Sequence, residues 1–244
     1  MIGKTIGPTE GSVHRIMKKA IAVVLLCVVA VAGVLAADAK LFNSVSVGAG
    51  FDMFTASAKG YTTITKEPYD IKANGMGVGA GVTAMIDLSA IPDFMKEGWF
   101  GYGDIEVFFP DRITIGDDVY DKDSEYTRIG FKAHMEVLRA VDFGIPVKFY
   151  FGAGFSYGMV LVTQKKNEQI NSSSSQAFGA GLTAIAEYPF GNHFAVNITV
   201  SPDFTFLTRV DSSVRYRGTE LISRSASLGF GFSLTAKAGV RYIF

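Results

Sequence analysis

The sequence predicts an all-β protein: a closed, antiparallel, up-and-down transmembrane β-barrel of about eight strands. From residue 43 onward, apolar residues alternate with small or polar ones at a period of two, which is the pattern of β-strands. The polar face of this alternation is mostly Gly, Ser and Thr, and such small residues suit the interior of a narrow barrel. An even number of strands closed on itself leaves no unpaired edge in a bilayer.

The alternation is clearest at the carboxy terminus, where residues 227–244 keep one apolar face without a slip. The same pattern predicts seven further strands, and Pro202 predicts a bulge in the last of these. No segment after residue 40 has the i, i+3, i+4, i+7 apolar spacing of a helix, so little helix is expected. The seven segments are 44–53, 75–88, 104–109, 128–137, 147–159, 178–188 and 194–206.

The amino-terminal segment, residues 1–37, is predicted to be an extension plus a secretory signal peptide whose true start is Met17. Two lysines precede an uncharged apolar run over 20–37, which ends in the small residues Ala36 and Ala37. The barrel domain would then cover 38–244. The alternative is an uncleaved membrane anchor, because the uncharged run approaches the ~20 residues that span a bilayer.

The composition excludes several classes of function. Lys plus Arg and Asp plus Glu both number 23, so no basic excess points to nucleic acid. The single cysteine, Cys27, lies in the predicted signal peptide, which leaves the mature chain no thiol for a disulfide or a Cys-ligated metal. The glycines of 75–81 lack the spacing of a dinucleotide-binding loop, because Ala80 stands where the third glycine is needed. No cofactor is expected.

The face that meets lipid follows from the polar residues. Alternation alone also fits a soluble, lipocalin-like barrel whose apolar face points inward. Such a barrel would cover its outside with Lys and Glu. Here the polar face consists mostly of the small residues Gly, Ser and Thr, so we assign the apolar face to lipid. The scattered charges of the polar face are then predicted to pair inside the lumen, because unpaired burial is costly. These are Asp104, Glu106, Arg128, Lys132, Glu136, Lys148, Lys237 and Arg241, together with Glu187.

The predicted connections alternate in length. Long, polar connections are expected over 55–73, 110–124, 160–176 and 209–224. Shorter connections are expected near 139–145 and 189–193, with one of middle length near 89–98. Four long and three shorter connections place both chain termini on the side of the shorter ones.

The last seven residues resemble the terminal signature of bacterial outer-membrane barrels, in which aromatic or apolar residues alternate up to a final Phe. Val240, Tyr242 and Phe244 fit it, and the resemblance implies that the barrel assembly machinery recognises them. The layout of 40–244 resembles the small eight-stranded superfamily that includes the OmpA transmembrane domain, OmpX, OmpW and the opacity proteins. The resemblance implies an outer-membrane location among outer-membrane lipids. Since short turns are periplasmic in such barrels, both termini are expected in the periplasm.

Two connections carry charge that suggests binding. Arg209, Arg215, Arg217 and Arg224 make the fourth long connection basic, and Arg can bind lipopolysaccharide phosphates or a host polyanion through two donors. A merely solvated loop is the other interpretation. Residues 121–125 are acidic but lack the turn glycine and distal glutamate of a calcium loop, so no metal site is expected.

Three functions remain. The first is a barrel with surface-exposed loops that has an interaction or envelope-structural role. The second is a narrow porin-like channel for small or hydrophobic solutes, which the filled interior of an eight-stranded barrel opposes. The third, ranked last, is a barrel-embedded enzyme. The mature chain has only two histidines, His134 and His193, and neither is predicted near the long connections.

Overall fold

The computed structural model describes residues 42–61, 68–91, 93–116, 118–121, 126–166, 168–217 and 219–244. All described residues belong to one compact unit, Lys40–Phe244. The predicted signal peptide and its start at Met17 lie outside the described residues, as does most of the acidic segment 121–125. No helix among the described residues has the length and apolar character needed to cross a membrane.

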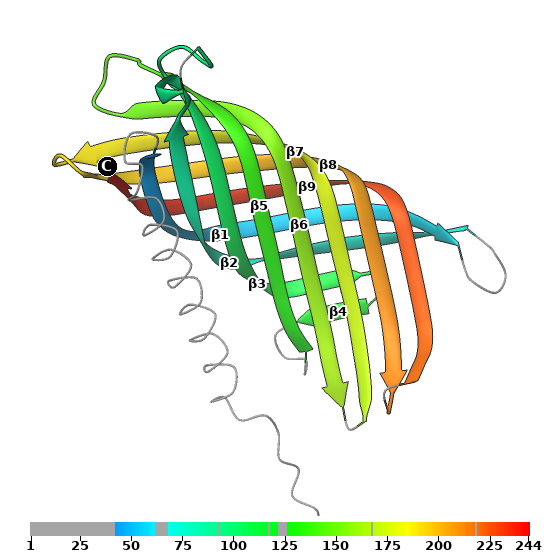
Figure 1. The fold of residues 1–244 in the computed structure, drawn as a ribbon. Coiled ribbons are helices and arrows are strands. Elements are labelled where there is room, and N and C mark those ends of the chain that lie inside the picture. Colours follow the sequence, from blue (N-terminus) through cyan, green and yellow to red (C-terminus); the bar gives the residue numbers. More distant parts are fainter. Residues whose placement is uncertain are drawn as a thin grey trace, which may run out of the picture. The chain divides into compact units, whose positions relative to one another are not determined.

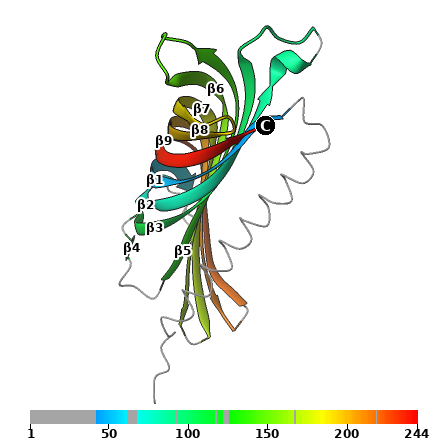
Figure 2. The ribbon, with the colours of Figure 1, turned by 90° about the vertical axis from the view of Figure 1, so that its left-hand side faces the viewer.

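Eight long antiparallel strands form a closed ring (Figures 1 and 2). Each pairs with its neighbours along the chain, and β9 pairs back with β1 from Ser44↔Ile243 to Gly60↔Ala226. This confirms the antiparallel up-and-down barrel. The strands are β1 (Phe42–Tyr61), β2 (Pro68–Asp87), β3 (Trp99–Ile115), β5 (Tyr126–Val141), β6 (Lys148–Lys166), β7 (Gln169–Phe190), β8 (Phe194–Tyr216) and β9 (Thr219–Ile243).

Two small elements complete the unit. Strand β4 (Asp118–Asp121) folds back on the end of β3, with Arg112↔Asp121 and Ile115↔Asp118 as its outermost pairs. A single 3-10 turn, η2 (Leu88–Ala90), begins the connection between β2 and β3. The Asp87 side chain accepts hydrogen bonds from the Ser89 backbone N–H and hydroxyl, and so caps this turn.

The alternation in the sequence corresponds to side chains that face in turn the inside and the outside of the barrel. On β7, residues 179 to 187 alternate between buried and more exposed side chains, with Gly, Thr, Ile and Glu inside. Large apolar side chains point outward, and Met135 and Phe230 are 74% and 77% exposed. The soluble-barrel alternative requires these side chains inside, so the arrangement contradicts it and agrees with an outer face covered by acyl chains.

The two ends of the barrel differ. One end, here called the terminal end, holds Phe42 and Phe244 and the connections 88–98, 142–147 and 191–193. At the opposite, hairpin end, β6 turns into β7 and β8 turns into β9 within two residues, 167–168 and 217–218. The prediction of four long loops is therefore wrong, because most residues of 55–73, 110–124, 160–176 and 209–224 belong to strands. Ser172–Ser175 are polar on both faces, so this extension shows no hydropathy alternation.

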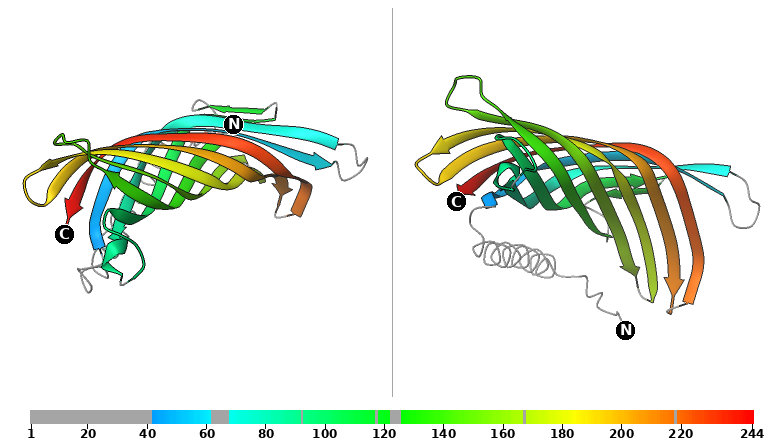
Figure 3. Two further views of the ribbon diagram at one scale, coloured as in Figure 1. Left: turned by 90° about the horizontal axis from the view of Figure 1, so that it is seen from above. Right: turned by 45° about the horizontal axis from the view of Figure 1, so that its top comes forward.

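Beyond the apolar belt, the hairpin-end parts of the strands have mainly polar outer faces, although Ile170 is exposed on that of β7. On β7 the outward residues become Ser172, Ser174 and Gln176, and on β8 they become Arg209 and Arg215. We call residues 160–166, 169–177, 208–216 and 219–227 the hairpin extension. A spanning strand needs ~9–11 residues, whereas β8 has 23 and β9 has 25. The extension thus continues well past the apolar belt, and the β1–β2 hairpin diverges from it (Figures 1 and 3).

The wall is irregular where the extension begins. Pairing of β7 with β8 shifts from Phe178↔Leu207 to Gly179↔Thr205, so that Phe206 is an extra, bulged residue. Pairing of β8 with β9 is interrupted between Thr205↔Gly231 and Arg209↔Ser227. The bulge predicted at Pro202 is therefore four residues away. The proline instead occupies a gap in the β7–β8 ladder, where its missing N–H costs no hydrogen bond.

Candidate functional site

The barrel lumen gathers the buried charged side chains of the described chain. They come from β1, β3, β5, β7, β8 and β9, each at an inward position of its strand. Arg241 and Glu106 are 1% and 0% exposed, so the group is removed from bulk solvent. The members of this lumen network are Asp52, Asp104, Glu106, Lys132, His134, Glu136, Glu187, Asp203, Lys237 and Arg241.

The two lysines connect opposite sides of the wall. Lys132 Nζ lies 2.8 Å from Asp52 Oδ1 and also donates to the Thr235 hydroxyl at 2.8 Å. Lys237 Nζ lies 2.5 Å from Asp104 Oδ1 and 3.6 Å from Glu106 Oε2. Both ammonium groups are therefore paired with carboxyl groups from other strands, as burial of a charge demands.

A histidine continues the network across the lumen. His134 Nδ1 lies 3.2 Å from Asp104 Oδ2, and its Nε2 lies 3.1 Å from Asp203 Oδ1. The Ser233 hydroxyl donates to Asp203 Oδ2 at 2.7 Å. The contacts run without interruption from Lys237 through Asp104 and His134 to Asp203, and they join β9, β3, β5 and β8 from inside the barrel.

A separate ion pair lies nearer the terminal end. Arg241 Nη1 is 2.5 Å from Glu187 Oε2, and both side chains are almost fully buried. The Tyr150 hydroxyl donates to Glu187 Oε1 at 3.5 Å, and the Arg241 guanidinium lies 5.7 Å from the centre of the Tyr150 ring. The guanidinium is thus held by a carboxylate and an aromatic face.

Carboxyl groups outnumber cations in the lumen. The network has six Asp and Glu side chains against two Lys, one Arg and one His. Neither carboxyl oxygen of Glu106 or of Glu136 has a hydrogen-bond partner within the described chain. A Cβ built on Gly181 would lie 2.7 Å from Glu136 Oε1 and 2.9 Å from Asp203 Oδ1, so these two acidic groups are close neighbours. The centre of the barrel is therefore acidic and crowded with acceptors.

Apolar clusters enclose the middle of the network. Towards the hairpin end, Phe108, Ile113 and Val210 belong to a buried cluster with side chains from six strands. Towards the terminal end, Met85, Tyr102, Leu138, Tyr150 and Ile185 form a second cluster. Phe108 and Leu138 are 1% and 0% exposed, so side chains fill the described interior as expected for eight strands.

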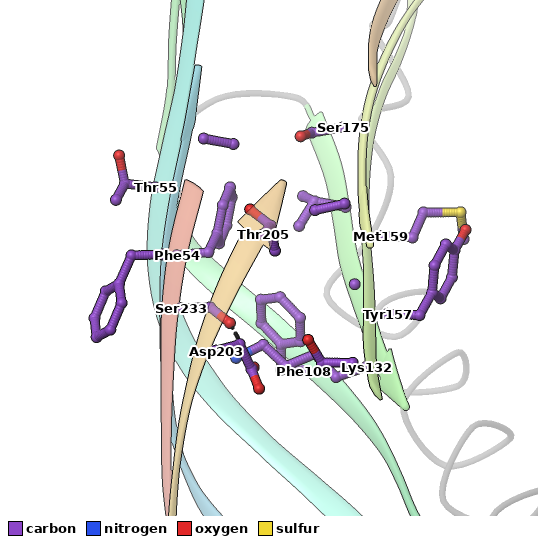
Figure 4. Close-up of a pocket in the computed structure, with 16 residues that line it drawn as sticks. Phe54, Thr55, Phe108, Lys132, Tyr157, Met159, Ser175, Asp203, Thr205 and Ser233 are labelled. Carbon is purple, nitrogen blue, oxygen red and sulfur yellow. Dashed lines mark hydrogen bonds between the residues drawn. The ribbon is translucent and has the colours of Figure 1, made fainter. Parts of the chain in front are cut away.

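A small cavity lies between the network and the hairpin-end cluster (Figure 4). It offers about 30 Å³ and is lined by Phe54, Phe108 and Lys132 among others, whereas Tyr157 and Met159 point away from it. This space fits about one water molecule. The Ser156 and Thr205 hydroxyls at its edge have no hydrogen-bond partner in the described chain, so they suit such a water.

The structure brings six of the eight residues predicted to form the charge network, and Glu187, into the lumen. Arg128 lies instead at the seam of β3, β4 and β5, where it donates to the Asp111 carbonyl at 2.8 Å. Lys148 is the first residue of β6, so its side chain is exposed at the terminal end. The six are Asp104, Glu106, Lys132, Glu136, Lys237 and Arg241.

Three members of the network were missed as pairing residues. Asp52 and His134 stand on the inward face of their strands in the sequence pattern, which was the available signal. Asp203 directly follows Pro202, where the expected bulge made the direction of the side chain unpredictable.

His134 is only 2% exposed between two Asp side chains, and His193 is exposed beside the Ile243 carbonyl. No described group of three or more His, Cys, Asp or Glu could hold a metal ion.

The arginines predicted as a basic loop lie on the β8–β9 hairpin. Arg209 Nε is 2.8 Å from Asp211 Oδ2, and Arg217 in the β8–β9 turn pairs with Glu168 in the neighbouring β6–β7 turn. Arg215 is exposed. Arg224 belongs to β9 opposite Ser212, and its side chain is outside the described part. These arginines are thus spread along an ordered ribbon, with acidic neighbours beside at least two of them.

The carboxy-terminal residues face outward. Val240, Tyr242 and Phe244 are 45%, 42% and 44% exposed. The Tyr242 ring lies 5.4 Å from Phe194 and 5.3 Å from Phe244, which adds to the aromatic residues at the terminal end. Recognition of these residues by the assembly machinery stays a prediction.

Comparison with known proteins adds to this picture. The profile of the family described as outer membrane protein β-barrel domain matches residues 23–202. OprG from Pseudomonas aeruginosa is 13% identical, with 84% of this chain and 97% of that chain covered and a TM-score of 0.48. A major outer membrane protein from Thermus thermophilus is 16% identical, with 80% of this chain and 99% of that chain covered and a TM-score of 0.47. The Neisserial surface protein A is 15% identical, with 82% of this chain and 97% of that chain covered and a TM-score of 0.42. Among curated proteins none matches the sequence.

Proposed function

Because the chain belongs to the family of outer membrane protein β-barrel domains, we propose that it is a non-conducting barrel that presents its hairpin extension as an interaction surface. The filled lumen carries this proposal. Charged residues joined across the barrel, with apolar clusters on both sides, leave a cavity for about one water molecule. The rigid barrel then acts as a support for what projects from it.

The hairpin extension suits a role outside the membrane. Its outer face is rich in Ser, Gln and Arg, and its strands are hydrogen-bonded to one another as far as Lys166↔Gln169 and Tyr216↔Thr219. An ordered ribbon loses less conformational entropy on binding than a flexible loop does. We place this end on the cell surface and both termini in the periplasm, because outer-membrane barrels carry their longer projections on the extracellular side, and β8 and β9 continue well past the apolar belt at the hairpin end.

Cysteine labelling tests both the orientation and the projection. The only cysteine of the sequence is Cys27, in the predicted signal peptide. Ser174→Cys on the extension should react with a membrane-impermeant maleimide in intact cells. Asp142→Cys, in a terminal-end turn, is the matched control and should react only after the outer membrane is permeabilised. Labelling of Asp142→Cys but not of Ser174→Cys in intact cells would reverse the orientation.

A narrow channel for small solutes is the second candidate. The observation in its favour is free space inside the wall, because a Cβ built on the inward Gly158 would meet nothing within 4 Å. The surplus of carboxyl groups would make such a path selective for cations. Conduction through such a path requires the Phe108 ring to move. The conductance would change on substitution of Lys132 or Arg241. A barrel-embedded enzyme stays last, because His134 is enclosed in the network.

A further inference from the structure

A pocket of about 230 Å³ opens on the outer wall where the apolar belt ends. It lies over β6, β7, β8 and β9, away from the lumen network. The residues that matter for its chemistry are Tyr157, Gln176, Phe178, Leu207, Thr208 and Arg209. We call it the bulge pocket, because it adjoins the extra residue of β8.

The irregular wall explains why a pocket forms there. The bulge at Phe206 lets two consecutive side chains, Phe206 and Leu207, point outward at 45% and 49% exposure. Beside them, the β8–β9 ladder is interrupted between Thr205 and Arg209. A regular ladder would present one outward side chain for every two residues and a continuous surface.

The pocket joins two chemical environments. Phe178 and Leu207 are apolar, partly exposed and on the membrane-facing side of the wall. Gln176 and Arg209 belong to the polar hairpin extension directly beyond them. Thr208 is one of the lining residues, and its buried hydroxyl has no hydrogen-bond partner in the described chain. An amphiphile with an apolar chain and a polar head matches this order of residues.

Arg209 is positioned to bind an anion. Its contacts with Asp211 are made through Nε, at 2.8 Å and 3.1 Å. The Nη1 and Nη2 edge of the guanidinium is not used in these contacts, and it offers paired donors of the geometry that phosphate oxygens accept. The side chain is 61% exposed, so a headgroup can reach it. Asp211 beside it weakens the attraction without blocking that edge.

We propose that the bulge pocket binds one membrane lipid whose phosphate headgroup has a net negative charge. Its acyl chain lies against Phe178 and Leu207, and its phosphate lies on Arg209. The occupant is a lipid because this wall faces acyl chains at the level where headgroups begin. The site needs no protein partner and is independent of the function proposed above, since it exists whichever end of the barrel is outside.

Native mass spectrometry of the full, refolded barrel in detergent tests the site by counting bound lipids. The probes are phosphatidylglycerol and lipid A, with zwitterionic phosphatidylcholine as the comparison. One phosphatidylglycerol or lipid A should bind in preference to phosphatidylcholine, and the stronger of the two identifies the natural source. Arg209→Gln should lower the preference about tenfold, the loss expected for charge-assisted hydrogen bonds.

Two further variants make the result specific. Arg217→Gln is the matched control, because this arginine is exposed on the same ribbon but does not line the pocket, and it should bind lipid like the wild type. Asp211→Asn should strengthen binding, because it removes the negative charge beside Arg209. Equal losses in Arg209→Gln and Arg217→Gln, or equal binding of phosphatidylcholine, would overturn the proposal. A heat-modifiable gel band confirms that each variant is folded.

Discussion

Lys237 Nζ on β9 lies 2.5 Å from Asp104 Oδ1 on β3, across the lumen and 133 residues away in the sequence. Both side chains are almost fully buried, at 3% and 1% exposure. Neither strand is a neighbour of the other in the ring, because β1 and β2 separate them. The pair therefore joins the wall through its centre, and it ties the last strand to one made much earlier in the chain.

Lys237→Met should destabilise the barrel by about 3–5 kcal/mol, because it leaves Asp104 buried without its main cation. Equilibrium unfolding in urea, with the barrel in lipid vesicles, measures this. Lys148→Met is the control, since Lys148 is exposed, and it should change the free energy of unfolding by less than about 0.5 kcal/mol. Equal effects of the two substitutions would mean that the lumen pair contributes nothing particular.

Glu136→Gln and Glu187→Gln should have different effects. Neither oxygen of Glu136 has a hydrogen-bond partner in the described chain, and Asp203 is close by. An amide there removes a surplus acid and adds donors, so it should leave the free energy of unfolding unchanged or raise it by about 1 kcal/mol. Glu187 binds Arg241, and its replacement should cost about 1.5–3 kcal/mol. The same unfolding assay would contradict the account of surplus acids if Glu136→Gln were the more damaging change.

Gly229→Ala should impair closure of the barrel. A Cβ at this position would lie 1.4 Å from the Ser57 carbonyl oxygen of β1, and backbone cannot give way by that much cheaply. The yield of the fast-migrating, unboiled gel band should fall sharply. Gly103→Ala is the matched control, because a Cβ there meets nothing within 4 Å, and it should fold like the wild type. Normal folding of Gly229→Ala would show that β9 and β1 can separate there at little cost.

Removal of the outer half of the β8–β9 hairpin should leave the barrel intact. Deleting 213–223 and joining Ser212 to Arg224 through an Asn-Gly turn keeps the ladder in register, because these two residues are paired. The lumen network and both apolar clusters lie outside the deleted segment. The free energy of unfolding should therefore change by less than about 1 kcal/mol. A barrel that no longer folds would show that the extension is needed for assembly.

The sequence predicts this fold well where the two faces of a strand differ in polarity. On β9, Phe230 and Gly231 belong to an unbroken alternation, so the strand and its inward side could be read directly. The same alternation placed Lys132, Glu136 and Lys237 inside the barrel. It could not predict which side chain each of them would contact. Pairing partners depend on strand register, which a single alternating pattern does not contain.

The rest escaped prediction for physical reasons. Ser172 to Ser175 are small and polar on both faces, so the strand extension resembles a flexible loop in composition. β4 is only four residues long and is held by its pairing with β3, which no local pattern predicts. Asp203 lay beyond Pro202, where a bulge was expected in the wrong place. The bulge at Phe206 has no glycine or proline to mark it.

Single-channel recording in planar lipid bilayers tests the closed lumen most directly. A double variant, Phe108→Ala with Leu138→Ala, thins both apolar clusters and shows what an opened barrel would conduct. The refolded wild-type protein should give no stepwise current in symmetric salt while the double variant does. Stable, discrete conductance steps from the wild type, altered by Lys132→Gln, would contradict a filled interior and make the narrow channel the better description.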